Sequence, residues 1–199
     1  MSRKSRVLSL ILGIVMILGM LPLSAFAAGE GGFENFTKQR SFSETTFSDV
    51  KAEDWFYDNV KAAYELGFMV GTSSGAFDPE GNLTIAQAVT VAVRLHSIYT
   101  SGADSFGRTA PWYKAYADYA KEKGIIAADY PDYSKKATRA EFAAILAGAL
   151  PEEALSGINN VEDNAIPDVA MGDANAEAIY FLYRAGIFAG NDTKGTLAP

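Results

Sequence analysis

The most regular feature of the chain is a helical spacing of apolar side chains that recurs in short segments, each followed by a glycine. From residue 55 to residue 66, apolar side chains recur about every 3.6 residues, and Gly67 comes next. Gly124 and Gly186 follow two further segments of the same kind. Because a glycine in the left-handed conformation commonly ends a helix, the pattern predicts three short amphipathic helices.

Two more apolar segments each begin at a threonine and predict a second kind of helix. Gln87 lies three positions after Thr84, and Glu141 lies three positions after Thr138. This is the spacing of a capping box, in which both side chains satisfy N–H groups at the start of a helix. The helix that begins at Thr138 is expected to run to Pro151, which cannot continue it.

These segments form three related units. In the first and third units, 18 positions separate an aspartate from the glycine that ends the first helix. The aspartates are Asp49 and Asp168, and the glycines are Gly67 and Gly186. The middle unit lacks this aspartate and the glycine-rich loop that follows the first helix elsewhere. In the first unit that loop covers residues 71–79, and we expect insertion of Phe77 into the core to order it. The fold is therefore expected to be all-α, built from helix-loop-helix repeats.

The third unit lacks a predicted second helix, which would begin beyond Pro199. The sequence is therefore expected to be a fragment of a longer chain or the product of a truncated reading frame. In its first helix Ile179, Leu182 and Tyr183 share one face. Without a covering helix, that face is expected to be exposed, rearranged or used in association. Residues 166–199 are accordingly expected to be the least stable part.

The beginning of the chain has the pattern of a secretory signal peptide. Basic residues precede an apolar run from Val7 to Leu21, and Ala25-Phe26-Ala27 has the small-x-small pattern of a cleavage site. The alternative is an uncleaved membrane anchor, but the run is shorter than the roughly 20 residues of a spanning helix. We expect residues 1–27 to be removed, which leaves a secreted protein with no membrane segment.

Composition excludes several classes of function. The chain has 199 residues, no cysteine and a single histidine, His96, so disulfides and multi-histidine metal sites are excluded. A serine–histidine–aspartate triad would need His96, which is expected to be an ordinary imidazole near a helix C-terminus, either solvated or favoured by the helix dipole. The net charge of −7 disfavours a nucleic-acid partner. No cofactor, metal or enzymatic activity is predicted.

The repeated motifs resemble those of the surface-layer homology (SLH) domain. They are Phe47-Ser48-Asp49-Val50, Trp55, Gly67-Phe68, the loop from Gly71 to Pro79, and Thr138-Arg139-Ala140-Glu141. The resemblance implies helix-loop-helix repeats in a pseudo-threefold bundle, with the third repeat incomplete. The expected parts are a signal peptide (1–27), a flexible segment (28–45) and repeats at 46–100, 108–151 and 165–199.

The resemblance also implies a function. Such domains anchor secreted proteins noncovalently to the bacterial wall by binding pyruvylated secondary cell wall polysaccharide. The expected partner is that polysaccharide or another polymer associated with peptidoglycan, and the expected location is the cell wall or surface layer. Two alternatives stay open: the chain is the targeting part of a larger secreted enzyme, or it is a helical-repeat module that binds another protein.

Candidate binding residues follow from the same motifs. Thr84, Gln87, Thr138 and Glu141 are assigned to helix capping, and the candidate ligand-binding residues are Arg139, Trp112, Lys135, Lys136, Trp55, Asp49 and Gly71. A cation in the first helical turn opposes the helix dipole. This favours a role for Arg139 in binding an anion over the alternative of an ordinary solvated arginine. Each tryptophan is either a core residue, which is the commoner case, or a platform for a sugar ring. Asp49 has the alternative role of ordering a turn.

The first and third units depart from the family pattern. Ile85 and Gln87 stand where the family has arginine and glutamate, and Ala174 replaces the tryptophan. Because Ile85 cannot pair with an anion and Glu80 would repel one, the first unit's site is expected to be weak. Introducing an arginine at position 85 is expected to raise affinity if the groove is otherwise formed.

Overall fold

The computed structural model describes residues 31–72, 74–190, 192 and 194–198. The helices, in chain order, are η2 (Phe33–Asn35), α2 (Tyr57–Glu65), α3 (Ile85–Ser101), α4 (Lys114–Glu122), α5 (Arg139–Ala147), η3 (Glu152–Ala154) and α6 (Ala176–Arg184). Within these described ranges, the β-pairing is limited to an isolated bridge between Thr84 and Lys136. The fold is therefore all-α, as the sequence predicts. The predicted signal peptide lies outside the described residues.

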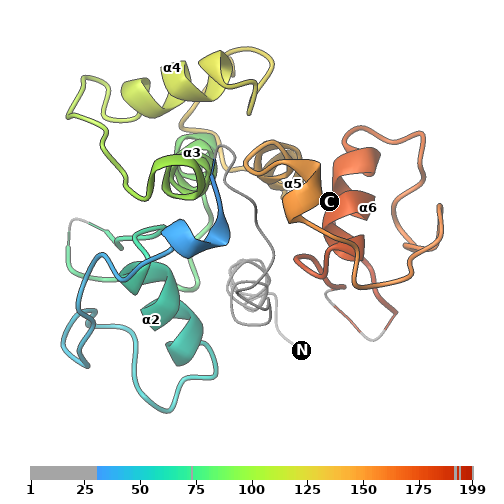
Figure 1. Ribbon diagram of the computed structural model, residues 1–199. Helices are drawn as coiled ribbons and strands as arrows, with labels where there is room; N and C mark the ends of the chain where they lie inside the picture. Colours follow the sequence, from blue (N-terminus) through green and yellow to red (C-terminus); the bar gives the residue numbers. More distant parts are fainter. Residues whose placement is uncertain (1–30, 73, 191, 193, 199) are drawn as a thin grey trace.

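The long helix α3 organises the middle of the molecule. It packs against η2, α4 and α5, and α5 packs in turn against α6 (Figure 1). Most side chains of α3 are buried, which explains why an apolar helix with few charged positions is stable here. The pseudo-threefold arrangement stays a prediction.

The same hydrogen bonds order the loops of the first and third units. Asp49 accepts hydrogen bonds from the N–H groups of Phe77 and Asp78, both at 2.7 Å. Asp168 accepts the equivalent bonds from Leu197 at 2.7 Å and Ala198 at 2.6 Å. In each loop the side chain of the first donor residue is buried, Phe77 in the first unit and Leu197 in the third. Insertion of Phe77 into the core, expected from the sequence, is confirmed.

The segment expected to be flexible, residues 28–45, is packed against the fold over its described part. The side-chain amide of Asn35 donates to the carbonyl oxygen of Tyr99 at 2.7 Å, and the N–H of Gly32 reaches the same oxygen at 2.9 Å. Phe33 lies edge-on to the Tyr99 ring. These contacts place η2 over the C-terminal end of α3, where the ring of Phe33 packs against Tyr99.

The apolar face of the third unit is covered, so of the three outcomes expected for it, exposure is wrong. Ile179, Leu182 and Tyr183 are 1%, 0% and 8% exposed. Helix α5 packs against α6 and belongs to the same hydrophobic cluster as these side chains, so it supplies the cover that we assigned to a later helix.

Helix boundaries differ from the prediction at two places. Helix α2 begins at Tyr57, after Trp55, and α5 ends at Ala147, before Pro151. Just after α5 the backbone comes so close to Ile125 that position 148 needs a glycine: a Cβ atom at Gly148 would lie 2.6 Å from the carbonyl oxygen of Ile125. The backbone here meets the segment that follows α4 in the same unit.

Candidate functional site

The start of α5 holds most of the candidate binding residues. The hydroxyl of Thr138 accepts a hydrogen bond from the N–H of Glu141 at 3.1 Å, and the Glu141 carboxylate accepts from the N–H of Thr138 at 2.9 Å. Both partners of the capping box are present. These two side chains are therefore engaged in starting the helix.

Lys135 is engaged in an ion pair and does not present an open cation. Its Nζ lies 2.7 Å from Oε1 of Glu141. Burial acts to raise the pKa of the Glu141 carboxyl, but the hydrogen bonds from Lys135 and from the Thr138 N–H outweigh it and lower the pKa. The carboxylate is therefore fixed in its charged form at neutral pH. The anion-attracting role of Lys135 stays a prediction, and any anion there would compete with Glu141 for this lysine.

Arg139 bridges the second and third units. Its Nη2 donates to the carbonyl oxygen of Ala189 at 3.1 Å, and its guanidinium carbon lies 5.4 Å from the centre of the Phe188 ring. A cation over an aromatic face is stabilised by the ring quadrupole, which offsets the unfavourable helix dipole at this position. The half-buried guanidinium is thus held at a junction between two repeats.

The equivalent end of α3 is closed by backbone from the second unit. The N–H groups of Ile85 and Ala86 donate to the carbonyl oxygens of Lys135 at 2.8 Å and Tyr133 at 2.9 Å. Ile85 is fully buried, and Gln87 completes the capping box of Thr84. The side chain of Lys136 is exposed, while its backbone pairs with Thr84. The first unit therefore has no counterpart of the Arg139 guanidinium.

Both tryptophans point to solvent, so the core role weighed for them is wrong. Trp55 is 58% exposed and Trp112 is 53% exposed. Each ring meets the next aromatic side chain edge-on with centroids 5.7 Å apart, Phe56 for Trp55 and Tyr113 for Trp112. Two units thus present an indole in the same way, as a sugar platform requires.

Sequence reasoning missed a row of aromatic side chains that starts at Trp112. Tyr113 is stacked on Tyr133 with centroids 4.7 Å apart, and Tyr130 meets Tyr133 edge-on. Burial, helped by the acceptor Asp129, raises the pKa of Tyr133 to about 12. The signal in the sequence was the density of tyrosines just before Thr138. We name Trp112, Tyr113, Tyr130 and Tyr133 the aromatic row.

Asp49 and Gly71 have local tasks in the first unit's loop. Asp49 orders the loop through the two backbone hydrogen bonds given above. Gly71 has a φ of +74°, and a Cβ atom there would overlap the ring of Phe47 and lie 2.7 Å from the carbonyl oxygen of Ala76. Both residues are explained by folding. The contacts that the structure gives them lead to the loop and not to Arg139.

Comparison with known proteins relates two stretches of the chain to one family. The family model of the S-layer homology domain matches residues 46–89 and 165–199. These two stretches are thus similar to S-layer homology domains, and the match supports anchoring at the cell surface. Within the described part, no helix is long and apolar enough to cross a membrane.

Several curated relatives are surface proteins, and others are enzymes. The chain is 30% identical to the surface-layer 125 kDa protein of Lysinibacillus sphaericus over 53% of this chain and 9% of that protein. It is 24% identical to a cell surface protein of Thermoanaerobacter kivui over 73% and 18%. It is 34% identical to the exoglucanase XynX of Acetivibrio thermocellus over 52% and 11%. The chain therefore spans less than a fifth of the length of each of these three relatives. The family match and the surface-protein relatives support a location at the cell surface.

Proposed function

We propose that the chain anchors a secreted protein by binding an anionic, pyruvylated secondary polysaccharide of the cell wall. The observation that carries the proposal is the place of Arg139, which is held at the junction of two repeats by Phe188 and Ala189. A guanidinium there can form a two-pronged, charge-assisted contact with a carboxylate such as a pyruvyl ketal. The exposed tryptophans and the aromatic row supply faces on which pyranose rings can stack.

The test is retention on purified wall sacculi, with and without removal of the nonpeptidoglycan polymer. The Arg139→Ala variant is expected to lose about tenfold or more in affinity for intact sacculi, because a charge-assisted contact is lost. Arg40→Ala is the matched control, since Arg40 also lies over an aromatic ring, that of Tyr64, but in the first unit. Unchanged retention of folded Arg139→Ala would contradict the proposal, and helix content measured by circular dichroism separates this outcome from unfolding.

A second candidate is that the chain is the targeting part of a larger secreted enzyme. Three of the relatives are named as enzymes: the exoglucanase, an amylopullulanase of Thermoanaerobacterium thermosulfurigenes and an endoglucanase of a Bacillus strain. In each, the matched region is 12% of the protein or less. Reading the gene beyond the codon for Pro199 tests this candidate directly. A protein-binding module, the remaining alternative, predicts no capture by purified wall polymer.

A further inference from the structure

A tyrosine of the third unit, Tyr183, lies beside the same aromatic ring as Arg139. The ring of Tyr183 meets that of Phe188 edge-on, with centroids 6.4 Å apart, and the guanidinium carbon of Arg139 lies 5.4 Å from the centre of Phe188. Arg139 belongs to α5 and Tyr183 to α6. The second and third units therefore each supply one polar group to the surroundings of this ring.

The charge of Arg139 acts on the hydroxyl group of Tyr183. Burial raises the pKa of Tyr183 to about 12; the charge of Arg139 acts against this rise, and those of Asp168 and Asp192 add to it. Both carboxylates already accept hydrogen bonds from backbone N–H groups of the third unit's loop. The hydroxyl therefore stays protonated at neutral pH and can donate a hydrogen bond.

Within the protein, the hydroxyl group of Tyr183 has a long hydrogen bond. It lies 3.4 Å from the carbonyl oxygen of Gly195, whereas O–H···O bonds are commonly about 2.7–2.8 Å. The hydroxyl of Tyr180, in the same helix, donates to the carbonyl oxygen of Val169 at 2.8 Å and accepts from the N–H of Ile166 at 3.0 Å. Tyr180 is fully buried, and Tyr183 is 8% exposed. Helix α6 thus carries one tyrosine hydroxyl that the fold uses and one that a ligand can replace its weak partner at.

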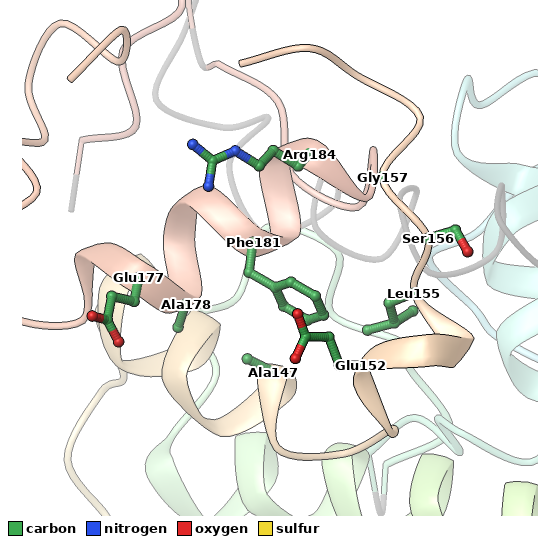
Figure 2. Close-up of a pocket in the computed structure, with 9 residues that line it drawn as sticks. All are labelled: Ala147, Glu152, Leu155, Ser156, Gly157, Glu177, Ala178, Phe181 and Arg184. Carbon is green, nitrogen blue, oxygen red and sulfur yellow. The ribbon is translucent and has the colours of Figure 1, made fainter. Parts of the chain in front are cut away.

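The cation that follows Tyr183 in α6 is engaged elsewhere. Nε of Arg184 donates to the carbonyl oxygen of Val161 at 2.9 Å, and its Nη2 lies 2.7 Å from the carboxylate of Asp163. Arg184 lines a groove beside the last residue of α5, whereas Arg139 is the first residue of that helix (Figure 2). Arg139 is therefore the cation available at the Tyr183 hydroxyl.

We propose that Tyr183 is a second ligand-binding residue of the Arg139 site and donates its hydroxyl hydrogen to the carboxylate of the wall polymer. The inference rests on the proposed function, since it concerns the same carboxylate. A guanidinium and a neutral O–H donor beside one ring can each bond to one of the two carboxylate oxygens. Because the donors come from α5 and α6, the bound carboxylate links the second and third units.

The first unit offers a matched control at Tyr64. Tyr64 and Tyr183 each lie three positions before the glycine that follows their helix. The ring of Tyr64 packs edge-on against Phe42 and Phe47, with centroids 6.0 Å and 5.2 Å away. The cation over that ring, Arg40, comes from the same unit and not from a neighbouring one. Removal of the Tyr64 hydroxyl is therefore expected to leave binding unchanged.

The first experiment measures binding of a methyl hexopyranoside that carries a cyclic pyruvyl ketal, by nuclear magnetic resonance. Tyr183→Phe should weaken binding about tenfold, because a hydrogen bond to a charged group is lost, and Tyr64→Phe should bind like the wild type. The methyl ester of the probe should bind weakly to the wild type and to Tyr183→Phe alike. No loss with the acid in Tyr183→Phe, or an equal loss with acid and ester, would overturn the proposal.

A measurement on the wild type needs no folded variant. The ring signals of Tyr183 should shift saturably with the acid probe and not with its ester, while those of Tyr64 stay in place with both. Shifts of equal size with acid and ester would overturn the role of the hydroxyl in binding the carboxylate. Thermal unfolding shows whether Tyr183→Phe keeps its fold.

The second experiment separates this proposal from the proposed function. Retention on intact sacculi is compared for Arg139→Ala, Tyr183→Phe and the double variant. If both side chains bind one carboxylate, the fold loss of the double variant should be smaller than the product of the two single losses. Losses that multiply would overturn the shared carboxylate. Loss in Arg139→Ala with none in Tyr183→Phe would support the anchoring site and reject Tyr183, and unchanged retention of both would reject both proposals.

Discussion

At the scale of single residues, one motif position has opposite surroundings in two units. The side chain after the capping threonine is Ile85 in α3 and Arg139 in α5. Ile85 is fully buried and its N–H is bonded to the second unit, whereas Arg139 is half-buried and reaches the third unit. Sequence reasoning treated the two positions as interchangeable, but the partner that packs over each helix start decides whether a charge is tolerated.

This difference reverses the effect expected for an arginine at position 85. The Ile85→Arg variant should lower the free energy of unfolding by roughly 3 kcal/mol or more, because a charge would be buried without a partner. Urea unfolding measures the loss. Gln87→Glu, which restores the other family residue in the same capping box, should change stability by less than about 1 kcal/mol. A stable Ile85→Arg variant with raised affinity for sacculi would contradict the argument.

The histidine also belongs to the residue scale, because it is half-buried, and of its two predicted states the solvated one is wrong. Nδ1 of His96 lies 3.1 Å from the carbonyl oxygen of Ala149, and the ring contacts Tyr119. Burial lowers its pKa below the ordinary 6.5; the Ala149 hydrogen bond acts against this shift, and the charge of Lys123 adds to it. The folded protein therefore takes up a proton less readily than the unfolded chain.

The consequence is a loss of stability in mild acid. As the pH falls through about 6.5 and below, the unfolded state binds a proton at position 96 before the folded state does, so the free energy of unfolding decreases. His96→Gln should flatten the pH dependence between about pH 7 and about pH 5, as measured by thermal unfolding. Parallel curves for the variant and the wild type would assign the acid sensitivity to carboxylates.

At the scale of elements, the sequence was informative wherever a local rule governs the backbone. The capping boxes of Thr84 and Thr138 and the glycines after the short helices lie where predicted, because capping and left-handed backbone depend on nearby residues. The exposure of Trp55 and Trp112 was not predictable in this way. Whether an indole is buried depends on which unit lies opposite, and that is a tertiary property.

The loop aspartates give a prediction at this scale. Asp49→Ala should destabilise the first unit by about 1.5–3 kcal/mol, because two charge-assisted hydrogen bonds to backbone N–H groups are lost. Asp168→Ala should cost the third unit a similar amount, since its bonds have the same geometry. Denaturant unfolding of both variants, with the exposed Glu44→Ala as control, checks this. If only one of the two variants lost stability, the matching hydrogen bonds of the two loops would not contribute equally to the free energy of unfolding.

At the scale of the whole molecule, the buried side chains form two separate clusters. The larger one runs from α3 through α4 and α5 to α6, and it includes the third unit's Leu197. The smaller one is confined to the first unit: Phe47, Val50, Phe56, Val60, Ala63 and Phe77. The sequence predicted the members of each amphipathic face but not this division, because the periodicity of a helix does not specify which neighbour its apolar face meets.

The division changes which part of the protein is expected to open first. A small cluster loses less apolar contact on local unfolding than a large continuous one, so α2 and the loops packed on it should open at lower free energy than the third unit. Amide hydrogen exchange followed by mass spectrometry should therefore show faster exchange in α2 than in α6. This order is opposite to the one that an uncovered third unit would give. Faster exchange in α6 than in α2 would mean that the cover provided by α5 does not stabilise the third unit in solution.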